Sequence, residues 1–281
     1  MTRESTYIIR GGLEGRERLR LVARVMAPST TELLDRVGIA QDADCLDVGC
    51  GGGDVTLELA RRAHAGRVVG IDLDEAKLEI ATTEARAAGA VNIDYHCQDL
   101  RSLDLVSAYD VVHARFVLSH LADPQAAVDG LARVLRPGGA LVVVDIEKAA
   151  TLCEPPHRSF ERYIELYTLA ARARGVDPNI ARRLPGILAA AGCRPVRVNV
   201  VQPVGRQPKG YEGDVKLTAP VTLESIADAI LALDVAERGE LDSLVDDLYR
   251  LAADDETLIS TPRMVQAWGY RPVEVTPVNP P

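Results

Sequence analysis

Three glycines alternate with other residues directly after an acidic residue near position 50. Asp47 is followed by Gly49, Gly51 and Gly53, and Asp54 then opens a helical pattern. Because glycines have no Cβ atom, the backbone of such a loop can approach a ligand closely, and positive φ angles carry no steric penalty. A strand, a glycine turn and a helix start are the parts of a nucleotide-type cofactor site. We therefore expect this loop to bind a cofactor.

The glycine spacing differs from the dinucleotide fingerprint G-x-G-x-x-G. A fingerprint that starts at Gly49 needs its last glycine where Asp54 stands, and one that starts at Gly51 needs it at Thr56. A start at Gly52 fails as well. The sequence therefore disfavours a nicotinamide-dependent dehydrogenase.

Two further acidic residues stand where strand-like runs end. Asp72 ends the second run, and a carboxylate there can accept two hydrogen bonds from the vicinal hydroxyls of a ribose. The alternative is a helix N-terminal charge, but Asp74 can fill that role, so we favour ribose binding for Asp72. Asp99 follows the third run, and its alternative is an ordinary exposed loop aspartate.

Basic side chains cluster after the fourth strand-like run. His120 is our candidate catalytic residue, because a neutral imidazole can accept a proton as a nucleophile attacks. Arg115 can bind a carboxylate through both guanidinium nitrogens, or it can pair with Asp110 or a helix terminus. His113 points inward on its strand and is interpreted as a core residue.

The surrounding pattern predicts a parallel sheet covered by helices on both faces. Apolar runs without polar alternation are separated by helical segments, which is typical of doubly wound sheets. The expected strands are 43–48, 67–72, 93–97, 109–114 and 140–146. The expected helices start at Asp54, span 75–88, and span 124–135 with Asp123 as the N-cap and Pro137-Gly138-Gly139 as the end.

Helical segments flank this central pattern. Residues 14–37 are predicted to be helical with a break at Pro28-Ser29, and 156–174 and 178–191 are two more helices. A strand is expected at 193–201. Residues 221–253 form a long acidic helical stretch, split near Gly239, and 258–268 is a last strand that Pro262 interrupts or begins.

The pattern D-x-G-x-G-x-G at Asp47, together with Asp72, Asp99-Leu100, the end of strand 109–114 and the segment 136–139, resembles the motifs of class I S-adenosylmethionine-dependent methyltransferases. The likeness covers roughly residues 40–148. Within the family, the sequence most resembles the ubiquinone/menaquinone-type subgroup. It implies an α/β fold, a doubly wound and mostly parallel seven-stranded sheet of the Rossmann-like methyltransferase type. N-terminal helices and a helical insertion would cover the substrate side.

The resemblance implies S-adenosyl-L-methionine as cofactor and S-adenosyl-L-homocysteine as product. Asp47 would order the glycine loop and contact the methionine end, Asp72 would bind ribose, and Asp99 would accept from the adenine amino group. The cofactor-binding residues would be Asp47, Gly49, Cys50, Gly51, Gly53, Asp72, Leu73, Asp99, Leu100, Ala114 and Arg115. The substrate-binding candidates are Tyr7, Phe116, His120, Tyr163 and Tyr167.

We expect three parts in the chain. Residues 1–40 would be an N-terminal helical lid, with Tyr7 and Gly11-Gly12 as its hinge or, alternatively, as a frayed terminus. Residues 41–148 would be the cofactor-binding core. Residues 149–281 would supply substrate-covering helices and the last strands of the same sheet, with 221–253 as an insertion over the substrate or a dimer contact.

Composition limits the classes of partner. The 32 Lys and Arg against 41 Asp and Glu give a net charge of −9, which speaks against nucleic acid as a partner. Five scattered cysteines without a C-x-x-C pair indicate neither disulfides nor a metal site. Neither a leader nor a membrane-spanning segment is evident, so we expect a cytoplasmic protein without membrane contact.

The sequence therefore predicts an enzyme that moves a methyl group to an O, N or C nucleophile of a small organic molecule, such as a specialised metabolite. Two alternatives stay open. One is a non-methylating enzyme of the same fold that uses bound S-adenosylmethionine for cyclisation or rearrangement. The other is a non-catalytic cofactor-binding subunit. A homodimer is the assembly that we consider.

Overall fold

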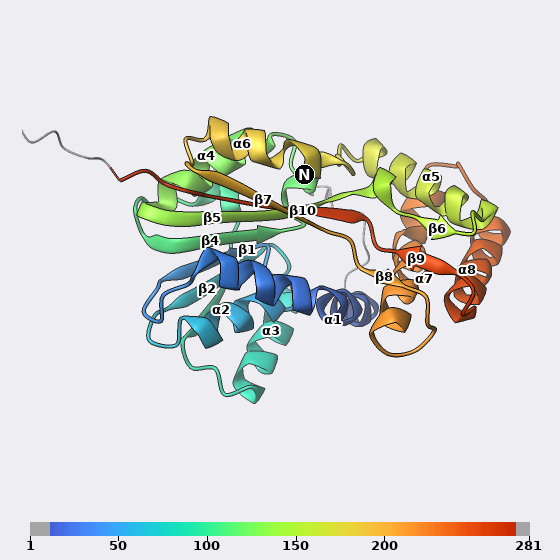
Figure 1. Cartoon of the computed structure of the whole chain (residues 1–281), viewed down its shortest axis with the longest axis horizontal. Coiled ribbons are helices and arrows are strands. Elements are labelled where there is room, and N and C mark those ends of the chain that lie inside the picture. Colours follow the sequence, from blue (N-terminus) through green and yellow to red (C-terminus); the bar gives the residue numbers. More distant parts are fainter. Residues whose placement is uncertain (1–11, 274–281) are drawn as a thin grey trace, which may run out of the picture.

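Seven strands form the central sheet of the computed structural model, which describes residues 12–273, with side chains from Arg18 onward (Figure 1). Their order is β3-β2-β1-β4-β5-β10-β7. The strands are β1 Cys45–Val48, β2 Val68–Asp72, β3 Ile93–Cys97, β4 Tyr109–Arg115, β5 Leu135–Glu147, β7 Val196–Val201 and β10 Arg263–Tyr270. The first five run parallel, and β10 is antiparallel to β5 and β7. The predicted doubly wound, mostly parallel sheet is confirmed.

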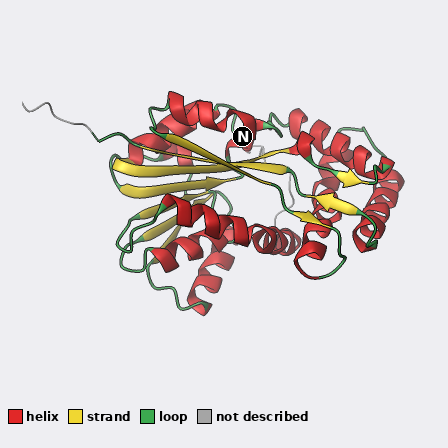
Figure 2. Cartoon of the chain, in the orientation of Figure 1, coloured by secondary structure: helices red, strands yellow, loops and turns green. Residues whose placement is uncertain are grey.

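Helices cover both faces of this sheet, as Figures 1 and 2 show. One face carries α1 Gly12–Val37, α2 Asp54–Arg62 and α3 Glu75–Ala87, and the other carries α4 Pro124–Val134 and α6 Leu184–Ala190. Neighbouring strand residues point to opposite faces. Leu46 packs in one buried cluster with Leu131 of α4, whereas Cys45 packs in the other with Leu59 of α2. Burial on both faces explains why these strands are apolar without alternation.

A helical unit lies at one end of the large sheet (Figure 1). It consists of α5 Arg158–Ala173, α7 Gly210–Leu231 and α8 Arg238–Ala253, with a small sheet of β6 Cys153–Glu154, β9 Leu258–Ser260 and β8 Val204–Gly205. Leu166, Ile226 and Leu248 belong to its own buried cluster. Among the described helices, none combines the length and the apolar composition needed to cross a membrane.

The predicted break at Pro28-Ser29 is wrong, because α1 continues through Pro28. Proline removes one N–H from the helix ladder, but the Ser29 hydroxyl donates to the Met26 carbonyl at 3.0 Å. Val25 and Leu33, on either side of Pro28, are both buried in the same cluster. Packing of the whole helix against the sheet therefore outweighs the local helix-breaking tendency.

Three other predicted boundaries need correction. Helix α7 begins at Gly210 rather than at residue 221, and the break before α8 falls at 232–237, because Gly239 already lies in the first turn of α8. The segment 137–139 lies inside β5, where Gly138 has a φ of 85° and the register with β4 shifts. The interruption at Pro262 is confirmed, since it separates β9 from β10.

Candidate functional site

The glycine loop between β1 and α2 has the backbone conformation that its sequence predicts. Gly49, Gly51 and Gly53 have φ angles of 64°, 53° and 81°. A Cβ atom at Gly49 would lie 2.5 Å from Cγ2 of Val117, just beyond β4, and one at Gly53 would clash with the Tyr95 hydroxyl. The loop thus lies tightly against the neighbouring strand ends, in a conformation that side chains disfavour.

Asp72 ends β2 directly beside this loop. Its Oδ2 accepts from the Gly51 N–H at 2.9 Å, and its Oδ1 accepts from the Asp74 N–H at 3.0 Å. The N–H of the buried Cys50 donates to the Ile71 carbonyl at 3.0 Å, which also ties the loop to β2. The N-cap of α3 is Asp74, as predicted, so Asp72 is not needed for capping.

Asp99 and Leu100, which are predicted for the adenine, and Leu73, another predicted cofactor-binding residue, lie at neighbouring strand ends. Leu73 is 64% exposed, which is unusual for a leucine beside a buried strand. Asp99 caps the short 3₁₀ helix η1 Leu100–Ser102, and the Arg101 guanidinium binds its carboxylate at 2.5 Å. Leu100 packs partly buried against the core. Because β2 and β3 are adjacent and parallel, Leu73 and Asp99 lie at the same edge of the sheet.

Asp47 lies in the interior rather than at the surface of the loop. Its side chain is buried, with Oδ2 accepting from the Thr56 hydroxyl at 2.7 Å and Oδ1 lying 2.8 Å from His113 Nδ1. It therefore joins β1 to α2 and to β4. The core position predicted for His113 is confirmed. Contact between Asp47 and the methionine end of a cofactor stays a prediction.

Arg115 pairs with the first residue of α2. Its guanidinium lies 2.6 Å from Asp54 Oδ2 and donates to the Thr30 hydroxyl at 3.2 Å. Of the alternatives raised by the sequence, the helix terminus is confirmed. Pairing with Asp110 is wrong, because that carboxylate binds Arg136 at 2.5 Å.

The end of β4 leads into the side chains proposed to face a substrate. Ala114 is buried. Phe116 has a φ of 58°, and strained backbone of this kind in a bulky residue gathers at functional sites. His120 lies half-buried in the 3₁₀ helix η2 Leu118–His120. Burial lowers its pKa to about 4, with smaller effects from Arg18 and Lys77, so the imidazole is neutral at pH 7.

Tyr163 and Tyr167 surround a residue that the sequence reasoning missed. Lys148 is 2% exposed, and its Nζ lies 2.6 Å from the Tyr163 hydroxyl. The same Nζ lies 4.1 Å and 4.4 Å from the ring centres of Tyr163 and Tyr167. Burial lowers the pKa of Lys148 well below its usual range and raises that of the Tyr163 hydroxyl. The charged pair Glu147-Lys148 directly after the apolar strand 140–146 was the available signal.

The N-terminal helix borders the glycine loop. A cavity of about 60 Å³ lies between them, lined by Leu19 and Ala23 of α1, by Gly52 and Asp54, and by Ile80 of α3. The substrate-binding candidate Tyr7 and the first hinge glycine, Gly11, lie outside the described residues. Within the described part of the chain, no group of three or more His, Cys, Asp or Glu side chains is arranged to hold a metal ion.

Comparison with known proteins points to one family. A methyltransferase domain model matches residues 45–139. The ubiquinone biosynthesis O-methyltransferase of Coxiella burnetii is 34% identical over 125 residues, 44% of this chain and 47% of the relative. That of Paracidovorax citrulli is 31% identical over 178 residues, 62% of this chain and 71% of the relative. The chain thus spans about half the length of the first of these relatives and over two thirds of the second.

Solved structures of low sequence identity share the fold. The YcgJ protein of Bacillus subtilis matches with a TM-score of 0.58 at 16% identity, over 88% of this chain and 99% of the other. The [4+2]-cyclase SpnF matches with a TM-score of 0.53 at 23% identity, over 88% and 80%. Together with the Paracidovorax relative, the motif positions identify the family. The chain belongs to the class I S-adenosylmethionine-dependent methyltransferases, to which the ubiquinone biosynthesis O-methyltransferases also belong.

Proposed function

We propose that this protein is an S-adenosylmethionine-dependent methyltransferase that acts on a small organic molecule. The observation that carries the proposal is the junction of the glycine loop with Asp72. Three glycines with positive φ approach a strand-end carboxylate, and the Gly51 N–H is already bound to it. This arrangement offers backbone donors and a ribose acceptor within one short segment.

The remaining residues have defined roles in this proposal. Asp72 would accept from the ribose hydroxyls, while Leu73 and Leu100 would pack on the adenine ring beside Asp99. The glycine loop and the backbone at Ala114 would hold the methionine end. Arg115 would act through Asp54, because its guanidinium already binds that carboxylate. Residues 1–40 would form a lid, and 149–281 would cover the acceptor.

The reaction makes modest chemical demands on the chain. Bound S-adenosylmethionine supplies a methyl group on a positively charged sulfur, which leaves in an in-line displacement. The protein aligns the acceptor with that methyl group and excludes water, which lowers the barrier by several kcal/mol. The curated relatives are named O-methyltransferases, which favours an oxygen acceptor over nitrogen or carbon here.

Calorimetric titration tests the proposal. We expect S-adenosylmethionine and S-adenosylhomocysteine to bind the isolated chain and NADH to give no heat. Heat with NADH and none with the two adenosyl compounds would overturn the proposal. Binding by the isolated chain, followed by transfer of labelled methyl to a small acceptor, would also remove the alternative of a non-catalytic subunit.

Cyclisation without methyl transfer is the second candidate function. The observation that favours it is the fold shared with a protein named as a [4+2]-cyclase. Incubation with methyl-labelled cofactor separates the two functions, since a cyclase turns over substrate without placing label in the product.

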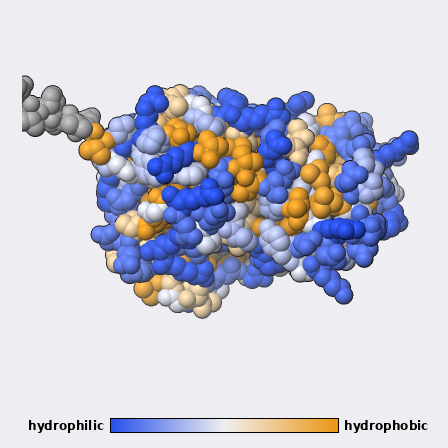
Figure 3. Space-filling view, viewed as in Figure 1, coloured by the Kyte–Doolittle hydropathy of each residue, from blue (hydrophilic) through white to orange (hydrophobic). Residues whose placement is uncertain are grey.

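A homodimer in the cytoplasm is the assembly and location that we propose. The edge strand β7 exposes Val198 and Val200 on one side, at 48% and 55%. Figure 3 shows a hydrophobic patch over this region, one of several on this face. Sedimentation equilibrium tests the dimer, and a monomer at micromolar concentration would contradict it. The net charge of −9 supports a small-molecule rather than a nucleic-acid partner.

A further inference from the structure

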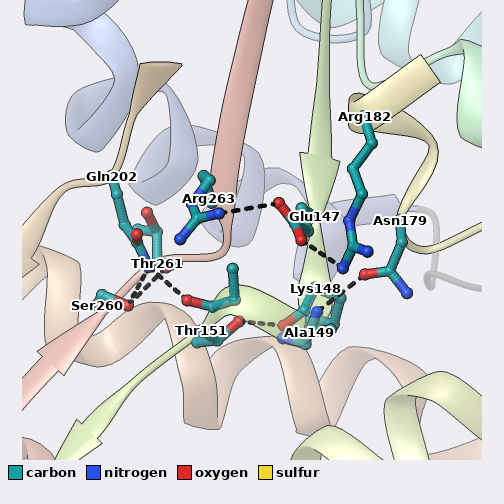
Figure 4. A network of polar contacts seen from close by, with 11 residues as sticks. Glu147, Lys148, Ala149, Thr151, Asn179, Arg182, Gln202, Ser260, Thr261 and Arg263 are labelled. Atoms are coloured by element: carbon teal, nitrogen blue, oxygen red, sulfur yellow. Dashed lines mark hydrogen bonds and ion pairs between the residues drawn. The ribbon is translucent and has the colours of Figure 1, made fainter. Parts of the chain in front are cut away.

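Lys148 occupies a rigid position at the carboxyl end of β5. It opens the 3₁₀ helix η3 Lys148–Ala150, and its N–H donates to the Pro178 carbonyl at 2.9 Å. The Ala149 N–H donates to Asn179 Oδ1 at 2.9 Å, and the Thr151 hydroxyl donates to the Lys148 carbonyl at 2.7 Å (Figure 4). The backbone of Lys148 is therefore fixed from both sides.

The charged neighbour of Lys148 points elsewhere. The Glu147 carboxylate binds Arg263 at 3.3 Å and also Arg182 (Figure 4). Among the described residues, Lys148 forms no ion pair, and its hydrogen bond to Tyr163 is the polar contact of its Nζ. Burial of an ammonium without a carboxylate favours the neutral amine, and it lowers the pKa of Lys148 well below its usual range.

A second buried lysine shows what a structural lysine looks like in this fold. Lys216 is 0% exposed, and its Nζ donates to the carbonyl oxygens of Arg206 and Asp254. Two backbone acceptors thus satisfy Lys216, which joins the start of α7 to the end of α8. Lys148 has no such pair of acceptors in the described part of the chain. It has a phenol oxygen and two aromatic faces instead.

Lys148 and His120 both lie within electrostatic reach of Arg18. The positive charge of Arg18 on α1 acts on the pKa values of His120, Lys148 and Tyr163 alike. The backbone also links their elements, because the Asp177 N–H donates to the Ser119 carbonyl in η2 while the adjacent Pro178 accepts from Lys148. Because β4 and β5 are adjacent and parallel, their carboxyl ends place His120 and Lys148 at the same edge of the sheet, where ligands of such folds bind.

Arg18 supplies a positive charge near Lys148 and His120, and its guanidinium has no acidic partner among the described residues. Its Nε is buried and has no hydrogen-bond partner within the described residues, and no described carboxylate forms an ion pair with its guanidinium. A site with an unused guanidinium donor, a neutral amine and aromatic walls suits a flat molecule that carries an acidic hydroxyl. The oxygen of such a hydroxyl can bear negative charge that Arg18 stabilises.

We propose that Lys148 binds and deprotonates a phenolic or enolic hydroxyl of the methyl acceptor, an inference that rests on the proposed methyltransferase function. The Tyr163 hydroxyl, a phenol 2.6 Å from Nζ, shows the contact that such an acceptor makes. The acceptor O–H bond breaks and its proton goes to Nζ. The oxygen electron pair forms the bond to the methyl carbon, and the carbon–sulfur bond breaks with its pair left on sulfur.

Lys148 suits this step better than His120. A phenol has an ordinary pKa near 10. Burial lowers the pKa of His120 to about 4, so proton transfer to the imidazole is strongly uphill. Burial lowers the pKa of the Lys148 amine as well, but its Nζ already lies 2.6 Å from a phenol oxygen, and the positive charge of Arg18 favours the phenolate that remains after the transfer. His120 then serves to orient the acceptor rather than to deprotonate it.

Lysine nuclear magnetic resonance tests the proposal directly, because the chain contains only four lysines, Lys77, Lys148, Lys209 and Lys216. The protein is labelled with ¹³Cε-lysine, titrated with pH, and then mixed with 4-nitrophenol, with nitrobenzene as the matched compound that lacks a hydroxyl. We expect one signal to titrate well below 10.5, to vanish in Lys148→Met, and to shift with 4-nitrophenol alone. Lys209→Met assigns an exposed signal and serves as the control.

Two outcomes would overturn the proposal. One is a Lys148 signal that titrates at its ordinary pKa, and the other is a signal that ignores 4-nitrophenol or responds equally to nitrobenzene. Cofactor calorimetry keeps the two hypotheses apart. A chain that binds S-adenosylmethionine but fails the phenol test retains the proposed function, whereas a chain that binds no cofactor loses it whatever Lys148 does.

A kinetic test follows once labelled methyl transfer reveals an acceptor. Lys148→Met should lower kcat about 10²- to 10⁴-fold, the usual contribution of a general base, and leave cofactor affinity unchanged. The acidic limb of its pH–rate profile, where the rate rises as Nζ loses its proton, should also disappear. A variant that retains kcat and the wild-type profile would show that the amine takes no part, and Lys209→Met is expected to match wild type throughout.

Discussion

At the scale of single residues, Asp72 has the most direct link between the cofactor loop and the sheet. Its two oxygens each accept one backbone N–H, which leaves lone pairs for ribose hydroxyls. Asp72→Ala removes both the loop contact and the ribose acceptor. We expect S-adenosylmethionine affinity to fall by about 1–2 kcal/mol, roughly 5- to 30-fold. Isothermal titration calorimetry measures the change.

Asp74→Ala is the matched control for that variant. It removes the N-cap of α3, which costs about 1 kcal/mol of stability, but it leaves the Asp72 carboxylate in place. We therefore expect near wild-type cofactor affinity for Asp74→Ala. Equal losses of affinity in the two variants would mean that Asp72 acts only through the stability of the loop.

The glycines of the loop differ in the space around them. Gly49 and Gly51 both have positive φ, so alanine costs about 1–2 kcal/mol at either position. At Gly49 the new Cβ also meets the Val117 side chain at 2.5 Å, whereas at Gly51 it meets nothing within 4 Å. We expect Gly49→Ala to lower the free energy of unfolding more than Gly51→Ala, as measured by urea denaturation. Equal losses would contradict this packing of the loop.

Some site residues could be predicted from the sequence because each stands at the end of a predicted strand or just beyond it. Asp72 and Asp99 lie at neighbouring strand ends for this reason. The sequence could not choose among the alternatives for Arg115, because Asp54 lies 61 residues away and the pair depends on how α2 packs beside β4. Lys148 was missed since a lone charge after a strand usually lies in solvent, and only the fold of α5 over η3 buries it.

At the scale of elements, α1 contains a proline where an ordinary residue would add a hydrogen bond. Pro28 has helical residues on both sides and lacks the N–H that would bond to the Arg24 carbonyl. Proline in a helix interior is about 3 kcal/mol less favourable than alanine. We expect Pro28→Ala to raise the free energy of unfolding by about 1–3 kcal/mol, as measured by urea denaturation.

Pro124→Ala provides the comparison for this helix. Pro124 occupies the first turn of α4, where its missing N–H would have no partner inside the helix, so alanine should bring no gain there. Destabilisation by Pro28→Ala would show instead that the bend at Pro28 is needed for α1 to follow the sheet.

Elements differ in how far the sequence predicts them. The first five strands were predicted within a few residues, except for the start of β5. Burial on both faces gives β1 and β2 largely apolar runs, whereas the edge strand β3 is partly exposed and was predicted from its place between helical segments. The start of α7 was missed because Gly210, Gly213 and Pro220 oppose a helix locally, although Val215 and Ala219 are buried in the structure. The strands β6 and β8 have two residues each, too few for any periodic signal.

At the scale of the whole molecule, buried titratable groups connect stability to pH. Burial lowers the pKa of His120 to about 4 and raises that of Asp145 to about 6. Between these values the folded chain lacks the histidine proton that the unfolded chain holds, but it keeps an aspartate proton that the unfolded chain releases. The two contributions oppose each other, so neither dominates the acid side of the stability curve.

The lowered pKa of Lys148 also makes stability depend on pH, and near neutral pH no such opposing pair cancels its effect. The direction of this effect can be tested. Below its ordinary pKa of 10.5, the unfolded chain carries a proton on this amine that the folded chain lacks, so folding must release a proton and wild type is destabilised. The penalty grows as pH falls toward the folded pKa and vanishes above 10.5.

We therefore expect Lys148→Met, which keeps an unbranched apolar chain, to be more stable than wild type at pH 7, with an advantage that shrinks toward pH 10. Urea denaturation across this range measures it, and the exposed Lys209→Met should show no such trend. A methionine variant that is less stable by a constant amount at every pH would mean that the folded amine is charged and paired.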